Sequence, residues 1–145
     1  MLIRVLIVDD HAFIRGALSD LLATTDDIVV VGTCADGSEV VETAARTTPD
    51  VVLMDLQMPK MPGLEATQAL LAAQPHIRVL VLSGDVAPGS AGAAMALGVA
   101  GFLLKEEDPF DLPRRIRVVA GGGTAWSDAA TATLRAYAGP VPRPA

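Results

Sequence analysis

The sequence predicts an α/β domain in which helices cover both faces of a parallel sheet. Short apolar runs alternate with segments of helical periodicity along the chain. These runs lack polar alternation, which is typical of strands that are buried on both faces. One domain suits 145 residues, and a hydrophobic content of 51% supplies its core. That core is expected to be aliphatic, because aromatic residues make up only 3% of the chain.

Five apolar runs are predicted to be strands, and helical patterns link them. The first helix carries Ile14, Leu18 and Leu21 at helical spacing, and Pro75 closes the third. The fourth linking segment is unusual, because residues 86–104 contain no charged side chain and several glycines lower its helix propensity. The predicted strands are 3–8, 28–33, 51–55, 79–83 and 100–104, and the predicted helices between them are 11–24, 38–47, 63–74 and 88–97.

Two further helices are expected near the C-terminus. The fifth should begin at Asp108-Pro109, where an N-cap residue precedes proline, and Pro113 predicts a kink or a late start. Ser127-Asp128 is typical of an N-cap and predicts a sixth, short helix over 128–138. We therefore expect one domain over 1–124, a short helical segment over 125–138, and a proline-rich linker or tail over 139–145.

Right-handed crossovers permit few strand orders for such a doubly wound, five-stranded (βα)5 sheet, and the flavodoxin-like order 2-1-3-4-5 is one of them. This order places the first and third strands side by side. Asp9 and Asp10 follow the first strand, and Asp55 follows the third. Ser83 and Lys105 follow the fourth and fifth. All five residues should therefore converge at the edge where sheets of this kind bind ligands.

Three close carboxylates repel one another unless a proton or a cation intervenes. Hard oxygen ligands favour Mg²⁺ or a similar ion. Asp55 is central and could attack phosphorus to give an acyl phosphate. Lys105 and the ion would neutralise the phosphoryl oxygens, and the Ser83 hydroxyl could donate to one of them.

Four motifs together carry a family resemblance. They are Val-Asp-Asp-His at 8–11, Met-Asp-Leu-Gln-Met-Pro-Lys-Met-Pro-Gly-Leu-Glu-Ala at 54–66, Leu-Ser at 82–83 and Gly-Phe-Leu-Leu-Lys at 101–105. Over roughly residues 2–121, the chain resembles the response regulator receiver domains of two-component signalling. Trp126-Ser127 after a glycine run is similar to the NarL/FixJ-type subfamily of transcription regulators.

The resemblance implies a role for each site residue. Asp55 would be the phosphoacceptor. Mg²⁺, with Mn²⁺ as an alternative, would bind Asp10, Asp55 and the Gln57 backbone carbonyl directly and Asp9 through water. Lys105 would hold a phosphoryl oxygen. The resemblance further implies that Ser83 is the switch hydroxyl, that Phe102 moves inward with it, and that Gln57 and Asp85 tune the loss of the phosphoryl group.

The resemblance also implies partners: a sensor histidine kinase as phosphoryl donor, and a second copy of the chain after phosphorylation. The segment 86–121 would rearrange and control this dimerisation. A net charge of −6 argues against nucleic-acid binding by these residues themselves. A single cysteine, Cys34, no visible signal peptide and no long apolar run favour a cytoplasmic protein without a membrane span.

Other functions remain as alternatives. A turnover phosphatase is disfavoured, because Gln57 stands where a general acid would be needed. A dinucleotide-binding domain is disfavoured because no Gly-x-Gly-x-x-Gly follows the first strand. A phosphate-independent binding module keeps this fold, but the full set of acidic, hydroxyl and lysine residues argues against it. The chain is expected either to precede a DNA-binding domain in a longer transcription regulator or to be a single-domain regulator that acts through protein contacts.

Overall fold

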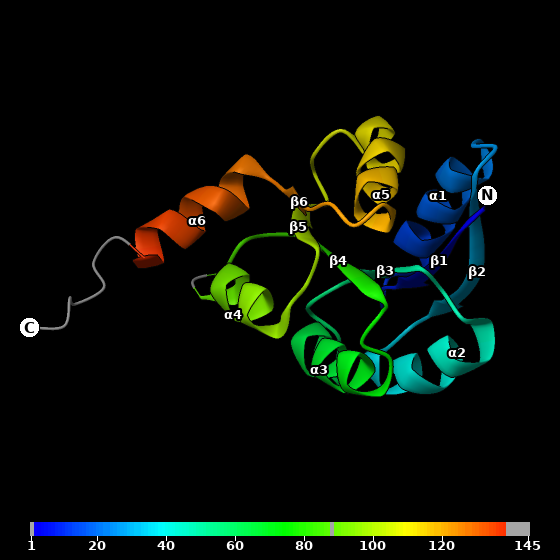
Figure 1. The fold of residues 1–145 in the computed structure, drawn as a ribbon, viewed down its shortest axis with the longest axis horizontal. Helices are drawn as coiled ribbons and strands as arrows, with labels where there is room; N and C mark the ends of the chain where they lie inside the picture. Colours follow the sequence, from blue (N-terminus) through cyan, green and yellow to red (C-terminus); the bar gives the residue numbers. More distant parts are fainter. Residues whose placement is uncertain (1, 88, 139–145) are drawn as a thin grey trace, which may run out of the picture.

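The computed structural model describes residues 2–87 and 89–138 and shows helices on both faces of a parallel sheet (Figure 1). Within these residues the sheet has six strands in the order β2-β1-β3-β4-β5-β6. The predicted α/β class and the order of the first five strands are confirmed. The strands are β1 (Ile3–Val8), β2 (Ile28–Cys34), β3 (Val51–Met54), β4 (Arg78–Ser83), β5 (Gly101–Leu104) and β6 (Ala125–Trp126).

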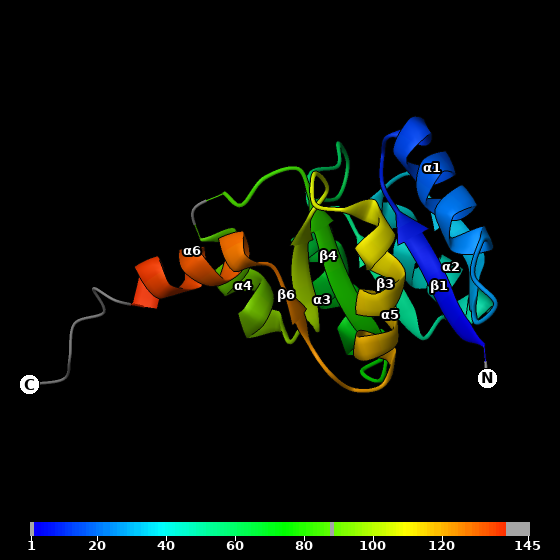
Figure 2. The same cartoon turned by 90° about the horizontal axis from the view of Figure 1, so that it is seen from above.

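Helices cover both faces of the sheet, α1 and α5 on one face and α2, α3 and α4 on the other (Figures 1 and 2). The first pair is α1 (Ala12–Ala23) and α5 (Leu112–Ala120). The second group is α2 (Val40–Thr47), α3 (Gly63–Ala73) and α4 (Ser90–Leu97). A 3-10 turn over Pro109–Asp111 precedes α5, so the late start predicted from Pro113 is confirmed.

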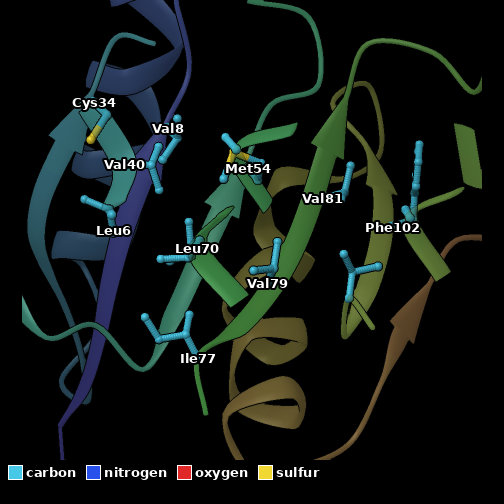
Figure 3. Packing of buried hydrophobic residues seen from close by; sticks show 14 of the residues in the cluster. Leu6, Val8, Cys34, Val40, Met54, Leu70, Ile77, Val79, Val81 and Phe102 are labelled. Carbon is cyan, nitrogen blue, oxygen red and sulfur yellow. The ribbon is translucent and has the colours of Figure 1, made fainter. Parts of the chain in front are cut away.

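The sheet therefore has two cores, and side chains from each strand alternate between them. Leu6, Val8 and Met54 point to the side of α2, α3 and α4, which Figure 3 shows, whereas Val5 and Ile7 point to the side of α1 and α5. This alternation follows from the two-residue period of a strand. Every residue of β3 is buried, as the continuous apolar run predicted.

The prediction of five strands was incomplete, because β6 extends the sheet beyond β5. Ala125 pairs with Gly101, and Trp126 pairs with Phe102, both in parallel. A Cβ atom on Gly101 would overlap the carbonyl oxygen of Ala125, so glycine allows this close approach. A strand of two residues is too short to show a periodic pattern, which is why the sequence did not reveal it.

Helix α6 (Asp128–Ala138) begins where the sequence predicted and lies next to α4 in both ribbon views (Figures 1 and 2). The Ser127 hydroxyl oxygen accepts a hydrogen bond from the Ala130 backbone N–H at 3.0 Å, which confirms Ser127 as the cap. The tail predicted over 139–145 and the helix start predicted at residue 88 lie outside the described residues.

Helix α4 forms in the uncharged segment, and alanine, methionine and leucine, which favour helices, make up most of it. Ala91 and Ala94 are fully buried in the core, and Gly98 ends the helix in the left-handed conformation with φ 89°. Tertiary packing of these small residues therefore adds to the helix propensity of a helix only eight residues long, which would be marginal by itself.

Candidate functional site

The carboxyl ends of β1 and β3 lie side by side and carry the acidic residues. The strands pair in parallel, with Val8 opposite Met54, and the Asp55 N–H donates to the Val8 carbonyl oxygen at 2.9 Å. Asp9 and Asp55 are buried, while Asp10 is partly exposed. One ligand atom from each of Asp9, Asp10, His11 and Asp55 lies within 4.8 Å of the others. The convergence that the strand order predicted is therefore present.

Lys105 reaches this cluster from the end of β5. Its Nζ lies 2.7 Å from Asp9 Oδ2 and 3.4 Å from Asp55 Oδ1. The backbone N–H of Lys105 donates to the Ser83 carbonyl oxygen at 2.8 Å, which ties the ends of β4 and β5 together. Burial lowers the pKa of Lys105, but the hydrogen bond to Asp9 and the charge of Asp55 outweigh burial and raise it overall. The side chain is therefore a cation across the physiological range.

Two carboxylate oxygens at the centre of the site are buried without a hydrogen-bond partner: Asp55 Oδ2 and Asp10 Oδ1. His11 Nδ1 lies 3.0 Å from both Asp9 Oδ1 and Asp10 Oδ1, and its hydrogen bond goes to Asp9. Buried acceptors without a donor are rare in folded proteins because leaving them unpaired is costly. Such oxygens therefore point to a ligand that would pair with them.

The charge of the site points to the same kind of ligand. Three carboxylates against one ammonium leave an excess of two negative charges, which is the charge that a divalent cation neutralises. Burial, followed by the charge of Asp9, raises the pKa of Asp55 above its ordinary value. Hard oxygen donors of this kind suit Mg²⁺ or Mn²⁺, so the residues present fit such an ion.

The loop after Asp55 is held by a residue that the sequence analysis did not single out. The carboxylate of Asp36, which follows β2, accepts hydrogen bonds from the backbone N–H groups of Ser38 at 3.0 Å, Lys60 at 3.0 Å and Met61 at 3.2 Å. This joins two loops and fixes the segment that carries Gln57. An Asp-Gly pair in the loop after a strand was the available signal, because that loop lies at the same sheet edge as the other acids.

Ser83, Gln57 and Asp85 line one cavity between the loops that follow β3 and β4. Ser83 is buried, whereas Gln57 and Asp85 are exposed. The structure therefore brings together the predicted switch hydroxyl and the two residues predicted to tune phosphoryl loss.

Phe102 lies in the packed core cluster that also contains Ala91 and Ala94 of α4 (Figure 3). Its ring is fully buried and stacks on Trp126, with centroids 6.3 Å apart and planes inclined by 23°. The aromatic expected to move inward is therefore already inside the protein here.

Comparison with known proteins identifies the class to which this fold and site belong. The family model of the response regulator receiver domain matches residues 5–117. The chain therefore belongs to the receiver domain family of two-component response regulators. Domains of this family act in signalling and bind Mg²⁺ at an acidic pocket of the kind found here.

Relatives place the chain in the NarL/FixJ-type group. It is 39% identical to the transcriptional regulatory protein DegU of Brevibacillus brevis over 121 residues, which are 83% of this chain and 51% of DegU. It is 38% identical to the response regulator protein VraR of Staphylococcus aureus over 122 residues, which are 84% of this chain and 58% of VraR. The chain thus spans between half and three fifths of the length of these relatives.

A crystal structure of a LuxR-family two-component response regulator from Aurantimonas sp. SI85-9A1 superposes with a TM-score of 0.88 at 28% identity. The match covers 95% of this chain and 99% of that chain, so it extends to the C-terminal elements. Among the helices that the structure describes, none combines the length and apolar character that crossing a membrane requires.

Proposed function

We propose that Asp55 accepts a phosphoryl group and that the resulting acyl phosphate switches this domain. The observation that carries the proposal is the unpaired, buried Oδ2 of Asp55, whose Oδ1 lies 3.4 Å from Lys105 Nζ. An oxygen without a donor keeps its lone pairs for phosphorus. In the transfer, an Asp55 oxygen forms a bond to phosphorus as the phosphorus–nitrogen bond of a phosphohistidine breaks, and the leaving imidazole keeps the electron pair and takes up a proton.

Asp10, Asp55 and the Gln57 backbone carbonyl would hold a divalent ion directly, and Asp9 would hold it through water. When bound, Mg²⁺ supplies positive charge that offsets the phosphoryl oxygens. Asp36 supports this set, because its hydrogen bonds to Lys60 and Met61 restrain the loop of Gln57.

Lys105 and Ser83 are proposed to recognise the phosphoryl group. Lys105 already contacts the Asp55 carboxylate, so its ammonium can transfer from carboxylate to phosphoryl oxygen with a small movement. Ser83 lines the adjacent cavity and can donate its hydroxyl from there. Phe102 is proposed to respond to this movement, because β5 carries it next to β4.

Gln57 and Asp85 are proposed to set how quickly the phosphoryl group is lost. Both line the cavity through which water would approach. Gln57 is not a general acid, so the domain would release its own phosphoryl group slowly rather than turn over a substrate.

We further propose a cytoplasmic receiver domain over 1–124, followed by a helical segment over 125–138 and a linker over 139–145.

A sensor histidine kinase would supply phosphate, and phosphorylated copies would dimerise. Homology to DegU, a transcriptional regulatory protein, supports an output on DNA through a further C-terminal domain. Action as a single-domain regulator through protein contacts is the second candidate.

Labelling by a small-molecule phosphoryl donor tests the assignment of Asp55. With Mg²⁺ and acetyl phosphate, the wild-type protein should gain one phosphoryl group that hydroxylamine removes, as expected for an acyl phosphate. Asp55→Asn should gain none, while Asp20→Asn, which changes an exposed acid on α1, should match the wild type. Equal labelling of Asp55→Asn and the wild type would refute the assignment.

A further inference from the structure

Trp126 contacts the aromatic residue of the proposed switch directly. It pairs with Phe102 across β5 and β6, and the Ser127 N–H donates to the Phe102 carbonyl oxygen at 2.9 Å. The two rings stack at a centroid distance of 6.3 Å. Phe102 has no exposed surface, whereas Trp126 is only partly buried and forms the outer layer of the pair.

Helix α6, which follows Trp126, packs against α4 and the core cluster beneath it. Ala130 is fully buried and belongs to the same packed cluster as Ala91, Ala94 and Phe102. Leu134, one turn further along α6, also packs against this cluster. Figure 1 shows α6 beside α4, and the strand that precedes it, β6, has only two residues.

We propose that Trp126 is a positioning residue for Phe102, and that β6 and α6 form an intramolecular cover that moves when Asp55 carries a phosphoryl group. The proposal rests on the proposed function and extends it to a segment beyond the phosphoryl site. Three features meet in this region: the buried ring of Phe102, the indole of Trp126 stacked on it, and helix α6 packed on α4.

A continuous set of contacts connects the site to this cover. Lys105 donates from its backbone N–H to Ser83, and Ser83 pairs with Leu104 of β5. A shift of Lys105 and Ser83 toward a phosphoryl group therefore acts on the end of the strand that carries Phe102. Protein cores are close-packed, so the Phe102 ring cannot be displaced without moving Trp126. A two-residue strand is easily released, because few backbone hydrogen bonds hold it.

Tryptophan emission offers a direct test, because Trp126 is the only tryptophan in the chain. Emission should change when acetyl phosphate and Mg²⁺ are added to the wild type, and amide exchange over residues 128–135 should become faster. Asp55→Asn should show neither change. Labelling of Asp55 is measured in the same samples. Absent labelling would count against the proposed function, whereas full labelling with unchanged emission and exchange would overturn the cover.

Substitutions at Trp126 distinguish a role in positioning Phe102 from a role in stabilising the fold alone. Before phosphorylation, Trp126→Ala should speed exchange over 128–135 by about tenfold, the scale expected for a lost aromatic pair. Phosphorylation of this variant should then speed amide exchange over 128–135 little further. Trp126→Phe keeps a ring on Phe102 and should restore the phosphorylation-dependent change in amide exchange over 128–135.

Ala130→Gln tests the cover without altering Trp126. It should also release α6, because Ala130 is buried against the cluster, whereas Ala132→Gln on the exposed side of α6 should not. The extent of Asp55 labelling should be unchanged in all these variants. If Trp126→Ala and Ala130→Gln both behave like Ala132→Gln, the cover has no role in the switch.

Discussion

Asp55 combines burial, an unpaired oxygen and a nearby negative charge in one side chain. Burial and the charge of Asp9 raise its pKa, so the ionised carboxylate is disfavoured in the folded protein. Lys105 offsets part of this, yet Asp55 Oδ2 remains without a donor. Natural proteins tolerate such local destabilisation where function needs it.

Replacing Asp55 with its uncharged isostere should therefore stabilise the metal-free protein. Asp55→Asn removes the repulsion with Asp9 while Lys105 keeps its 2.7 Å contact with Asp9. We expect a gain of about 1 kcal/mol in the free energy of unfolding at neutral pH, measured by urea denaturation without divalent ions. Asp20→Asn should change stability by less than about 0.5 kcal/mol. A loss of stability in Asp55→Asn would contradict this explanation.

The pKa of Asp36 is shifted in the opposite direction from that of Asp55. Burial alone would raise its pKa, but the N–H groups of Ser38, Lys60 and Met61 outweigh burial and hold the pKa below the ordinary value of 3.8. A carboxyl with a lowered pKa stabilises the fold fully above its unfolded value. That contribution is lost as the pH falls through the lower, folded value.

The clamp made by Asp36 should be measurable at single amides. Asp36→Ala should cost about 2 kcal/mol, because backbone N–H groups lose their acceptor, and exchange of the Lys60 and Met61 amides should accelerate. The same amides should be released in the wild type only below the ordinary pKa of an aspartate. Asp26→Ala, at an exposed acid, serves as the control; if it releases Lys60 and Met61 equally, Asp36 is not the clamp.

At the scale of elements, the strands buried on both faces were predictable and the short edge strand was not. β3 and β4 consist of apolar residues with flanking polar ends, so their limits show in the sequence. β6 depends instead on the shape of its neighbour, because Gly101 leaves room for the Ala125 carbonyl group. The pairing of β6 depends on its contact with β5, and the local sequence of β6 does not indicate that contact.

Two glycine substitutions in neighbouring elements should have opposite effects. Gly101→Ala should destabilise the protein by about 1–3 kcal/mol, because the added Cβ overlaps backbone and forces β5 and β6 apart. Gly92→Ala in α4 meets no atom within 4 Å and should stabilise by about 0.5–1 kcal/mol through helix propensity. Thermal and urea unfolding check both. A neutral Gly101→Ala would show that β6 pairs only loosely.

On the scale of the whole molecule, the fold concentrates negative charge at one edge of the sheet. Asp9 and Asp10 follow β1 and Asp55 follows β3, yet the three carboxylates share a site with the Lys105 ammonium group. The parallel arrangement produces this, because all carboxyl ends of the strands meet at one edge. A ligand that neutralises the edge should therefore stabilise the entire domain.

Mg²⁺ should raise the unfolding temperature of the wild type in a concentration-dependent way. A free concentration one hundred times the dissociation constant corresponds to about 2.7 kcal/mol. Asp10→Asn should lose most of this gain, because it removes a proposed direct ligand. NaCl at matched ionic strength controls for screening; an equal gain from NaCl would mean that Mg²⁺ acts without binding at this site.

The sequence by itself determined the α/β class and the group of residues at the strand ends, and it reduced the order of the first five strands to a few possibilities that include the observed one. It could do so because apolar patterning is a local property and because the handedness of crossovers excludes most topologies. Only the tertiary structure decided which oxygens lack a partner, how Asp36 holds the loop of Gln57, and how Trp126 and α6 seat on Phe102 and α4. These features depend on distances between segments far apart in the chain, and such distances are set by packing rather than by local pattern.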